Sequence, residues 1–260
     1  VDWLYCYFVY FELAVLSFLI PIFMLKELLL IDIETVPMVQ NFANLSEDWQ
    51  KLWLDKVKRS FAEDTLPEDT WLMKGGILAE FGKIVCISTA YFFEDENRNV
   101  CLKTKSIAGD DEKSVLIQFL ELCNKLYKHN RNFQFAGHNI KEFDIPYICR
   151  RLMINAIALP EYLWLHDRKP WEVKMLDTLS WWKFGDNKNY TSLHLLASVL
   201  QIPTSKDDID GSMVQHVYYV EKDLPRIVKY CEKDVVVVAN IILRYKGLPL
   251  LKQECIINVS

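Results

Sequence analysis

Hydrophobic and polar positions along the chain follow the two periods that distinguish strands from helices. The apolar run Leu28–Ile33 has the length of one strand, which predicts a strand buried on both faces. A charged turn separates Ile84–Phe93 from Val100–Ser106, and this arrangement predicts a β-hairpin. Shorter apolar runs predict two further strands at Phe133–Ala136 and Val173–Leu179.

Helical periodicity fills the segments between and after these strands. In Lys113–His129 the apolar residues recur with the spacing of one helix face. A helix is also predicted after Asn139 as far as Ile154. Three more are predicted nearer the C-terminus, at Thr191–Leu200, Met213–Val220 and Leu224–Tyr245.

The order of the elements predicts one α/β domain. Three strands come first, followed by helices that alternate with further strands, as expected of a mixed sheet flanked by helices. Residues 45–72 are charged and contain tryptophans at spacings that indicate a helical insertion. We assign residues 24–247 to the domain and residues 248–260 to a C-terminal tail.

Residues 1–23 form an apolar extension for which three interpretations stay open. The run 3–25 is long enough to span a membrane, which takes about 20 residues. It lacks the basic start and the cleavage site of a signal peptide. Met24 stands directly before the first predicted strand, so we favour translated upstream sequence. A membrane anchor and an additional packed helix are the alternatives.

Composition places the chain among globular proteins. Of its 260 residues, 51% are hydrophobic and 25% are charged, and the formal net charge is −5. A negative charge disfavours a non-specific nucleic-acid binder, although carboxylates that hold a divalent cation contribute to it. The seven cysteines include no Cys-x-x-Cys pair, which favours reduced core thiols in a cytoplasmic protein.

Three carboxylate motifs are the candidate chemistry. Asp32 and Glu34 lie two positions apart at the end of the first strand and therefore share one of its faces. Asp144 begins a helix, and Asp234 lies in the last helix, with Tyr230 one turn before it. Buried carboxylates need a counter-charge, and a divalent cation is the natural one. For each motif alone, a solvated strand end, a helix N-terminal carboxylate or a surface aspartate is the simpler interpretation.

The set of motifs resembles the DEDD, or DnaQ-like, exonuclease superfamily, which has a ribonuclease H-like fold. Asp32/Glu34, Asp144 and Asp234 match its three motifs, and Tyr230 matches its tyrosine branch. The likeness is strongest to predicted 3′→5′ exonucleases related to the proofreading domain of family B DNA polymerases. It extends over nearly all of residues 24–245 and is carried by LLLIDIETVP, FGKIVCIS, GHNIKEFDIPYI, LDTLSWWKFGD, SLHLLASVLQIPTSKDDIDGSMV and IVKYCEKDVVVVANIILRY.

The resemblance implies a metal-dependent 3′→5′ exonuclease. The four acidic residues would hold two divalent ions, Mg²⁺ or Mn²⁺, and Tyr230 would orient the attacking water. The substrate would be nucleic acid with a free 3′ end, and we favour single-stranded DNA. Trimming of RNA, a catalytically silent nucleic-acid-binding module and a membrane-anchored adaptor are the alternatives. No polymerase domain follows in this chain, so we expect no proofreading in cis.

Several residues near the motifs are candidate substrate contacts. Asn139, Phe143 and Lys206 are assigned to substrate binding. Their respective alternatives are helix capping, core packing and a solvated loop lysine. Asp177 follows a predicted strand and His138 precedes the second motif, and for both we favour a structural role.

Overall fold

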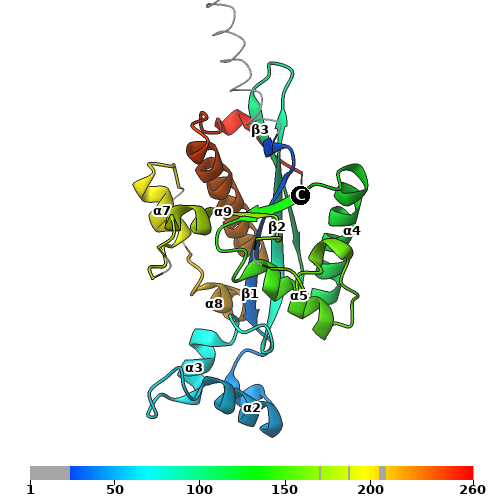
Figure 1. Ribbon diagram of the computed structural model, residues 1–260. Helices are drawn as coiled ribbons and strands as arrows, with labels where there is room; N and C mark the ends of the chain where they lie inside the picture. Colours follow the sequence, from blue (N-terminus) through cyan, green and yellow to red (C-terminus); the bar gives the residue numbers. More distant parts are fainter. Residues whose placement is uncertain (1–23, 170, 187, 205–208, 260) are drawn as a thin grey trace, which may run out of the picture.

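The computed structural model describes residues 24–169, 171–186, 188–204 and 209–259. A six-stranded sheet in the order β5-β4-β1-β2-β3-β6 forms its centre (Figure 1). The strands are β1 (Leu28–Pro37), β2 (Gly82–Glu94), β3 (Val100–Ala108), β4 (Gln134–Gly137), β5 (Met175–Asp177) and β6 (Ile256–Asn258). β2 is antiparallel to β1 and β3, whereas β4, β5 and β6 join through parallel pairs. The expected α/β architecture, a mixed sheet flanked by helices, is confirmed.

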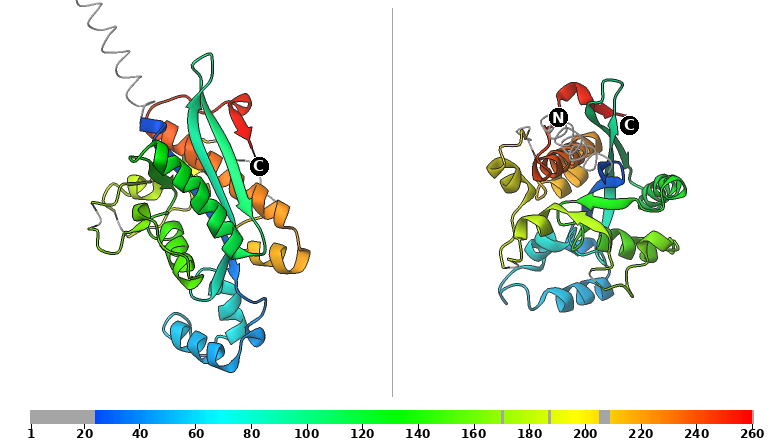
Figure 2. Two further views of the ribbon diagram at one scale, coloured as in Figure 1. Left: turned by 90° about the vertical axis from the view of Figure 1, so that its right-hand side faces the viewer. Right: turned by 45° about the horizontal axis from the view of Figure 1, so that its top comes forward.

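Helices cover both faces of this sheet (Figures 1 and 2). One face carries α4 (Glu112–His129) and α5 (Asp144–Ile154), and α9 (Leu224–Tyr245) crosses the other. α9 has the bounds that its apolar periodicity predicts, and it begins at the N-cap Asp223. The smaller elements are η2 (Glu161–Leu163), α6 (Thr178–Lys183), α7 (Leu193–Val199), α8 (Val214–His216) and the π-helix η3 (Val217–Glu221).

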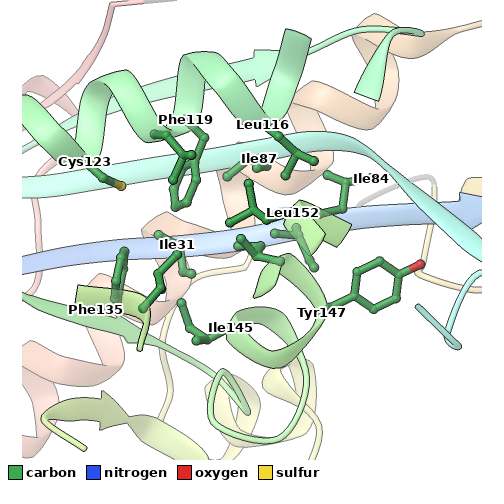
Figure 3. Packing of buried hydrophobic residues seen from close by; sticks show 14 of the residues in the cluster. Ile31, Ile84, Ile87, Leu116, Phe119, Cys123, Phe135, Ile145, Tyr147 and Leu152 are labelled. Carbon is green, nitrogen blue, oxygen red and sulfur yellow. The ribbon is translucent and has the colours of Figure 1, made fainter. Parts of the chain in front are cut away.

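β1 is buried on both faces, as its apolar run predicts. Alternate side chains from Leu29 to Ile33 enter the core that α4 and α5 complete (Figure 3). Leu28 and Leu30 pack instead against α9. Because successive side chains point to opposite faces of a strand, Asp32 and Glu34 continue the face that α9 covers.

The segment between β1 and β2 forms the predicted helical insertion. Its helices are η1 (Phe42–Asn44), α2 (Glu47–Val57) and α3 (Pro67–Lys74). The insertion lies at the end of the domain where β1 finishes (Figure 2). Trp53, Trp71 and Phe81 give it a small core of its own. The Thr35 hydroxyl donates a hydrogen bond to the Gly76 carbonyl at 2.8 Å, which fixes the end of the insertion against β1.

Two elements differ most from their predicted extents. β5 contains three residues, fewer than the predicted Val173–Leu179. It ends early because the Asp177 carboxylate accepts hydrogen bonds from the backbone of Leu179 and Ser180 and so begins α6. The helix predicted at Met213–Val220 is a short α8 that continues as the π-helix η3.

The C-terminal residues form elements for which the sequence predicts only a tail. η4 (Gln253–Cys255) leads into β6, which pairs in parallel with β3. A strand of three residues carries too short a pattern to be recognised from periodicity. Within the described ranges, no helix is both long and apolar enough to cross a membrane. The apolar extension 1–23 lies outside those ranges.

Candidate active site

The first two acidic residues of the candidate site come from β1. Ile31 and Ile33 point into the opposite core, so strand alternation directs Asp32 and Glu34 toward α9. Glu34 is buried and Asp32 is half-buried. The ladder between β1 and β2 shifts register just after Glu34, a feature that re-aims side chains near functional sites.

α9 brings three further residues against this face of β1. Cys231 is fully buried, and its thiol donates to Oδ2 of Asp32 at 3.2 Å. Tyr230 and Asp234 lie one helical turn apart. Burial and the carboxylates of Asp234 and Glu34 raise the pKa of Tyr230 far above its usual value. The Tyr230 phenol is therefore neutral at neutral pH and can orient a water but cannot act as a base.

α5 contributes Asp144 at its first turn. This carboxylate is buried, and its Oδ1 accepts a hydrogen bond from the backbone N of Ile33 at 3.2 Å. The bond places Asp144 beside the strand that carries Asp32 and Glu34. Burial raises the pKa of Asp144 to about 7, although backbone hydrogen bonds oppose the shift.

The carboxylates of Asp32 and Glu34 are affected both by burial and by neighbouring negative charges. Burial raises the pKa of Asp32 well above its usual value, and Asp234 and Asp144 raise it further. The pKa of Glu34 is raised in the same way, with Asp32 as its strongest charged neighbour. One ligand atom each from Asp32, Glu34 and Cys231 lie within 4.8 Å of one another. Carboxylate oxygens suit Mg²⁺ and Mn²⁺, and a bound cation would relieve the repulsion, so the donor set fits the expected metal.

Comparison with known families identifies the chain. The family described as predicted 3′→5′ exonucleases related to the exonuclease domain of PolB matches residues 77–249, more than half of the sequence. The chain belongs to this exonuclease family. The matched range contains Asp144, Tyr230 and Asp234, whereas Asp32 and Glu34 precede it. The family likeness inferred from the motifs is thereby confirmed.

The chain is also similar to solved structures, of which one is described here. The family B DNA polymerase from the hyperthermophilic archaeon Pyrobaculum calidifontis is similar over 84% of this chain, with 13% sequence identity and a TM-score of 0.47. The present chain spans 24% of the length of that polymerase. No curated protein sequence matches the chain.

The loop between β4 and α5 carries Asn139, five positions before Asp144. Asn139 has a positive φ of 62°, a conformation that is uncommon for a residue with a side chain and that occurs at functional sites. Its Oδ1 is buried and has no hydrogen-bond partner among the described residues. Buried polar atoms are almost always paired, so this oxygen lacks a partner that the described residues could supply.

Asp177 and His138 hold this loop in place, as the sequence analysis favours. Asp177 Oδ1 accepts from the backbone N of Asn139 at 3.0 Å while it also begins α6. The two nitrogens of the His138 ring lie 3.0 Å from the Thr178 hydroxyl and 2.9 Å from the Thr191 carbonyl. Both residues therefore support the site through the backbone of the surrounding loops.

The other predicted substrate contacts have different outcomes. Phe143 is half-buried, and its ring lies 5.4 Å from that of Tyr147, centroid to centroid. Tyr147 is fully buried and donates to the Gly76 carbonyl, so it is a core residue. Lys206 lies outside the described residues, and its contact stays a prediction.

The structure adds two residues that the sequence analysis does not assign to the site. Cys231 is predicted only as a core thiol, yet it donates to a carboxylate 199 positions away in the chain. Tyr190 is an exposed aromatic residue directly before Thr191, which contacts His138. The only sequence signal for Cys231 is its position beside Tyr230 in the third motif, and Tyr190 has none.

Proposed function

We propose that the protein removes nucleotides one at a time from the 3′ end of single-stranded DNA. The observation that carries this proposal is the buried carboxylate cluster that β1, α5 and α9 build together. The raised pKa values of Asp32, Glu34 and Asp144 support a role in cation binding, because structural carboxylates usually have a partner that keeps them ionised. The exonuclease family of the chain supplies the reaction class.

We propose Asp32, Glu34, Asp144 and Asp234 as the residues that hold two Mg²⁺ or Mn²⁺ ions. When bound, such a pair neutralises charge on the scissile phosphate and favours ionisation of the attacking water. The carboxylates must lose their protons to bind a cation. In the metal-free protein the ionised carboxylates therefore repel one another, and a bound cation would remove this repulsion.

Two other residues complete the proposed machinery. Tyr230 positions the attacking water through its neutral phenol. Asn139 is the proposed substrate contact in the β4–α5 loop, where its buried Oδ1 has no partner among the described residues. Phe143 and Lys206 remain proposed substrate contacts, and the Phe143 ring also packs against Tyr147.

The proposal also divides the chain into an N-terminal extension, a domain and a C-terminal tail. Residues 24–247 form the exonuclease domain, preceded by the apolar extension 1–23 and followed by the tail 248–260. The tail contributes β6 to the edge of the sheet. The cytoplasmic location expected from the cysteine content stays a prediction, and six described cysteines are free thiols, in agreement with it.

The test is to degrade 5′-labelled and 3′-labelled single strands of DNA and RNA with the full chain, in Mg²⁺, Mn²⁺ or EDTA. We expect a ladder that shortens from the 3′ end of DNA, requires the cation and disappears in Asp234→Ala. Preferential cleavage of RNA would replace the DNA assignment with RNA trimming. Binding without cleavage, by folded protein in either cation, would overturn the enzyme proposal in favour of a silent binding module.

A further inference from the structure

The segment before α7 is fixed against the candidate site by side-chain hydrogen bonds. The carbonyl of Thr191 lies 2.9 Å from Nε2 of His138, the residue before Asn139. The hydroxyl of Ser192 accepts from the backbone N of Leu195 and caps α7. Tyr190 directly precedes these two anchored residues, so its backbone position is set from one side by the β4–α5 loop.

Tyr190 has an exposed side chain that lies near two acidic residues of the neighbouring loops. It is 66% exposed. Its pKa is nevertheless raised, first by partial burial and then by the carboxylates of Asp144 and Asp177. Tyr190 therefore lies near enough to Asp144 for that charge to act on it, while most of its surface is open to solvent.

The ring of Tyr190 has no aromatic packing partner among the described residues. Among the described aromatic rings, Tyr190 takes part in no stacked or edge contact, whereas Trp181 packs against Tyr245 with ring centroids 5.7 Å apart. In the neighbouring β4–α5 loop, the buried Oδ1 of Asn139 also has no partner among the described residues. Nucleobases stack on exposed aromatic side chains in single-stranded nucleic acid binding, irrespective of sequence.

We propose that Tyr190 is a positioning residue whose ring stacks on the base of the 3′-terminal nucleotide and so delivers the terminal phosphodiester to the acidic cluster. This inference rests on the proposed exonuclease function. It also names the substrate feature that the site recognises, which is an unpaired terminal base. A base held in a duplex cannot offer its face to the ring, so single strands are preferred.

The experiment compares Tyr190→Ala and Tyr190→Phe with wild type on two single strands, one ordinary and one lacking the 3′-terminal base. Loss of stacking on one base is expected to raise KM about tenfold in Tyr190→Ala on the ordinary strand, with kcat changed less than about twofold. Tyr190→Phe keeps the ring and should stay near wild type. On the strand without the terminal base, wild type and Tyr190→Ala should be equal.

Tyr91→Ala is the matched control, because Tyr91 is a partly exposed tyrosine that lines a groove with Leu122 and Leu126 of α4, on the opposite face of the sheet from α9. It should leave KM unchanged. An equal effect of Tyr190→Ala on both strands, or no effect at all, would overturn the stacking role while leaving the nuclease intact. A wild-type protein that cleaves neither strand would instead count against the proposed function itself.

Discussion

Among the described residues, two groups bring a carboxylate together with cysteine, and they differ in the surroundings of that carboxylate. Ligand atoms of Asp32, Glu34 and Cys231 lie within 4.8 Å of one another, and so do those of Asp95, Cys101 and Cys255. The first group lies between β1 and α9. The second lies where the turn between β2 and β3 meets the residues before β6.

The difference between the two groups is in the partners of their carboxylates. Asp95 accepts hydrogen bonds from the backbone N atoms of Asn97 and Asn99, at 2.9 and 2.8 Å, and from the Asn99 side chain. These bonds lower its pKa. Asp32 is buried among other carboxylates, and its pKa is raised. A cluster of ligand atoms therefore indicates a cation site when its charges are left uncompensated, and the composition of the cluster alone does not.

The largest expected effect is on cleavage, and it distinguishes Asp32→Asn from Asp95→Asn. Asp32→Asn should reduce cleavage by at least about 10³-fold, on the order of 4 kcal/mol of transition-state stabilisation, because a proposed metal-binding carboxylate is lost. It should also raise the melting temperature of the metal-free protein, since a repelled buried charge is removed. Asp95→Asn should retain activity within about twofold and lower the melting temperature, since the turn loses acceptors.

Nuclease assays and thermal unfolding of both variants in EDTA would measure these effects. Equal loss of activity in the two variants, or a destabilised Asp32→Asn, would contradict the contrast between an uncompensated and a compensated carboxylate.

A second prediction concerns pH and follows from Asp144. Its pKa is about 7 in the metal-free native state, compared with about 3.9 for an unperturbed aspartate. Between these values the native state holds a proton that the unfolded state has released, so stability falls as pH rises from about 4 to about 7. A cation binds only the ionised carboxylates. Mn²⁺ should therefore stabilise the protein strongly above pH 7 and little near pH 5.

Thermal unfolding with Mn²⁺ and with EDTA, at pH 5 and pH 8, measures this difference. We expect a rise in melting temperature of several degrees, about 2–3 kcal/mol at saturating metal, at pH 8 only. Asp32→Asn is the control, in which the rise should be much smaller. A shift of the same size at both pH values would show that the cation binds elsewhere.

The smallest expected effect is on kcat, and it distinguishes the buried thiols of Cys231 and Cys101. Cys231→Val removes the hydrogen bond to Asp32 Oδ2 while it keeps an apolar side chain of similar size, so kcat should fall by less than about tenfold, the cost of one weak hydrogen bond. Cys101→Val, made in the satisfied cluster, should leave kcat unchanged. Steady-state assays of both variants decide this, and a larger loss in Cys101→Val would reverse the assignment of the two clusters.

More of the fold than of the site could be predicted from the sequence, because the patterns that predict strands and helices lie within each element. The apolar run of β1 and the periodicity of α9 are contained in their own residues, and both elements appear as expected. The acidic motifs could be located for the same reason. The contact between Cys231 and Asp32 joins residues 199 positions apart, and no local pattern records it. Asp177 likewise accepts a hydrogen bond from the backbone of Asn139, 38 positions away, and this contact depends on how two loops meet.

The parallel strand β6 has a consequence for the solubility of the domain. β3 would otherwise present an open strand edge, and unpaired backbone groups of that kind recruit strands from other molecules. β6 occupies the register from Leu102 to Thr104, and Val259 adds one more hydrogen bond to Thr104. Lys103 and Lys105 lie on the same stretch of β3. Residues 256–259 thus cover the edge of β3 and oppose edge-to-edge self-association, a role separate from the chemistry on the α9 face.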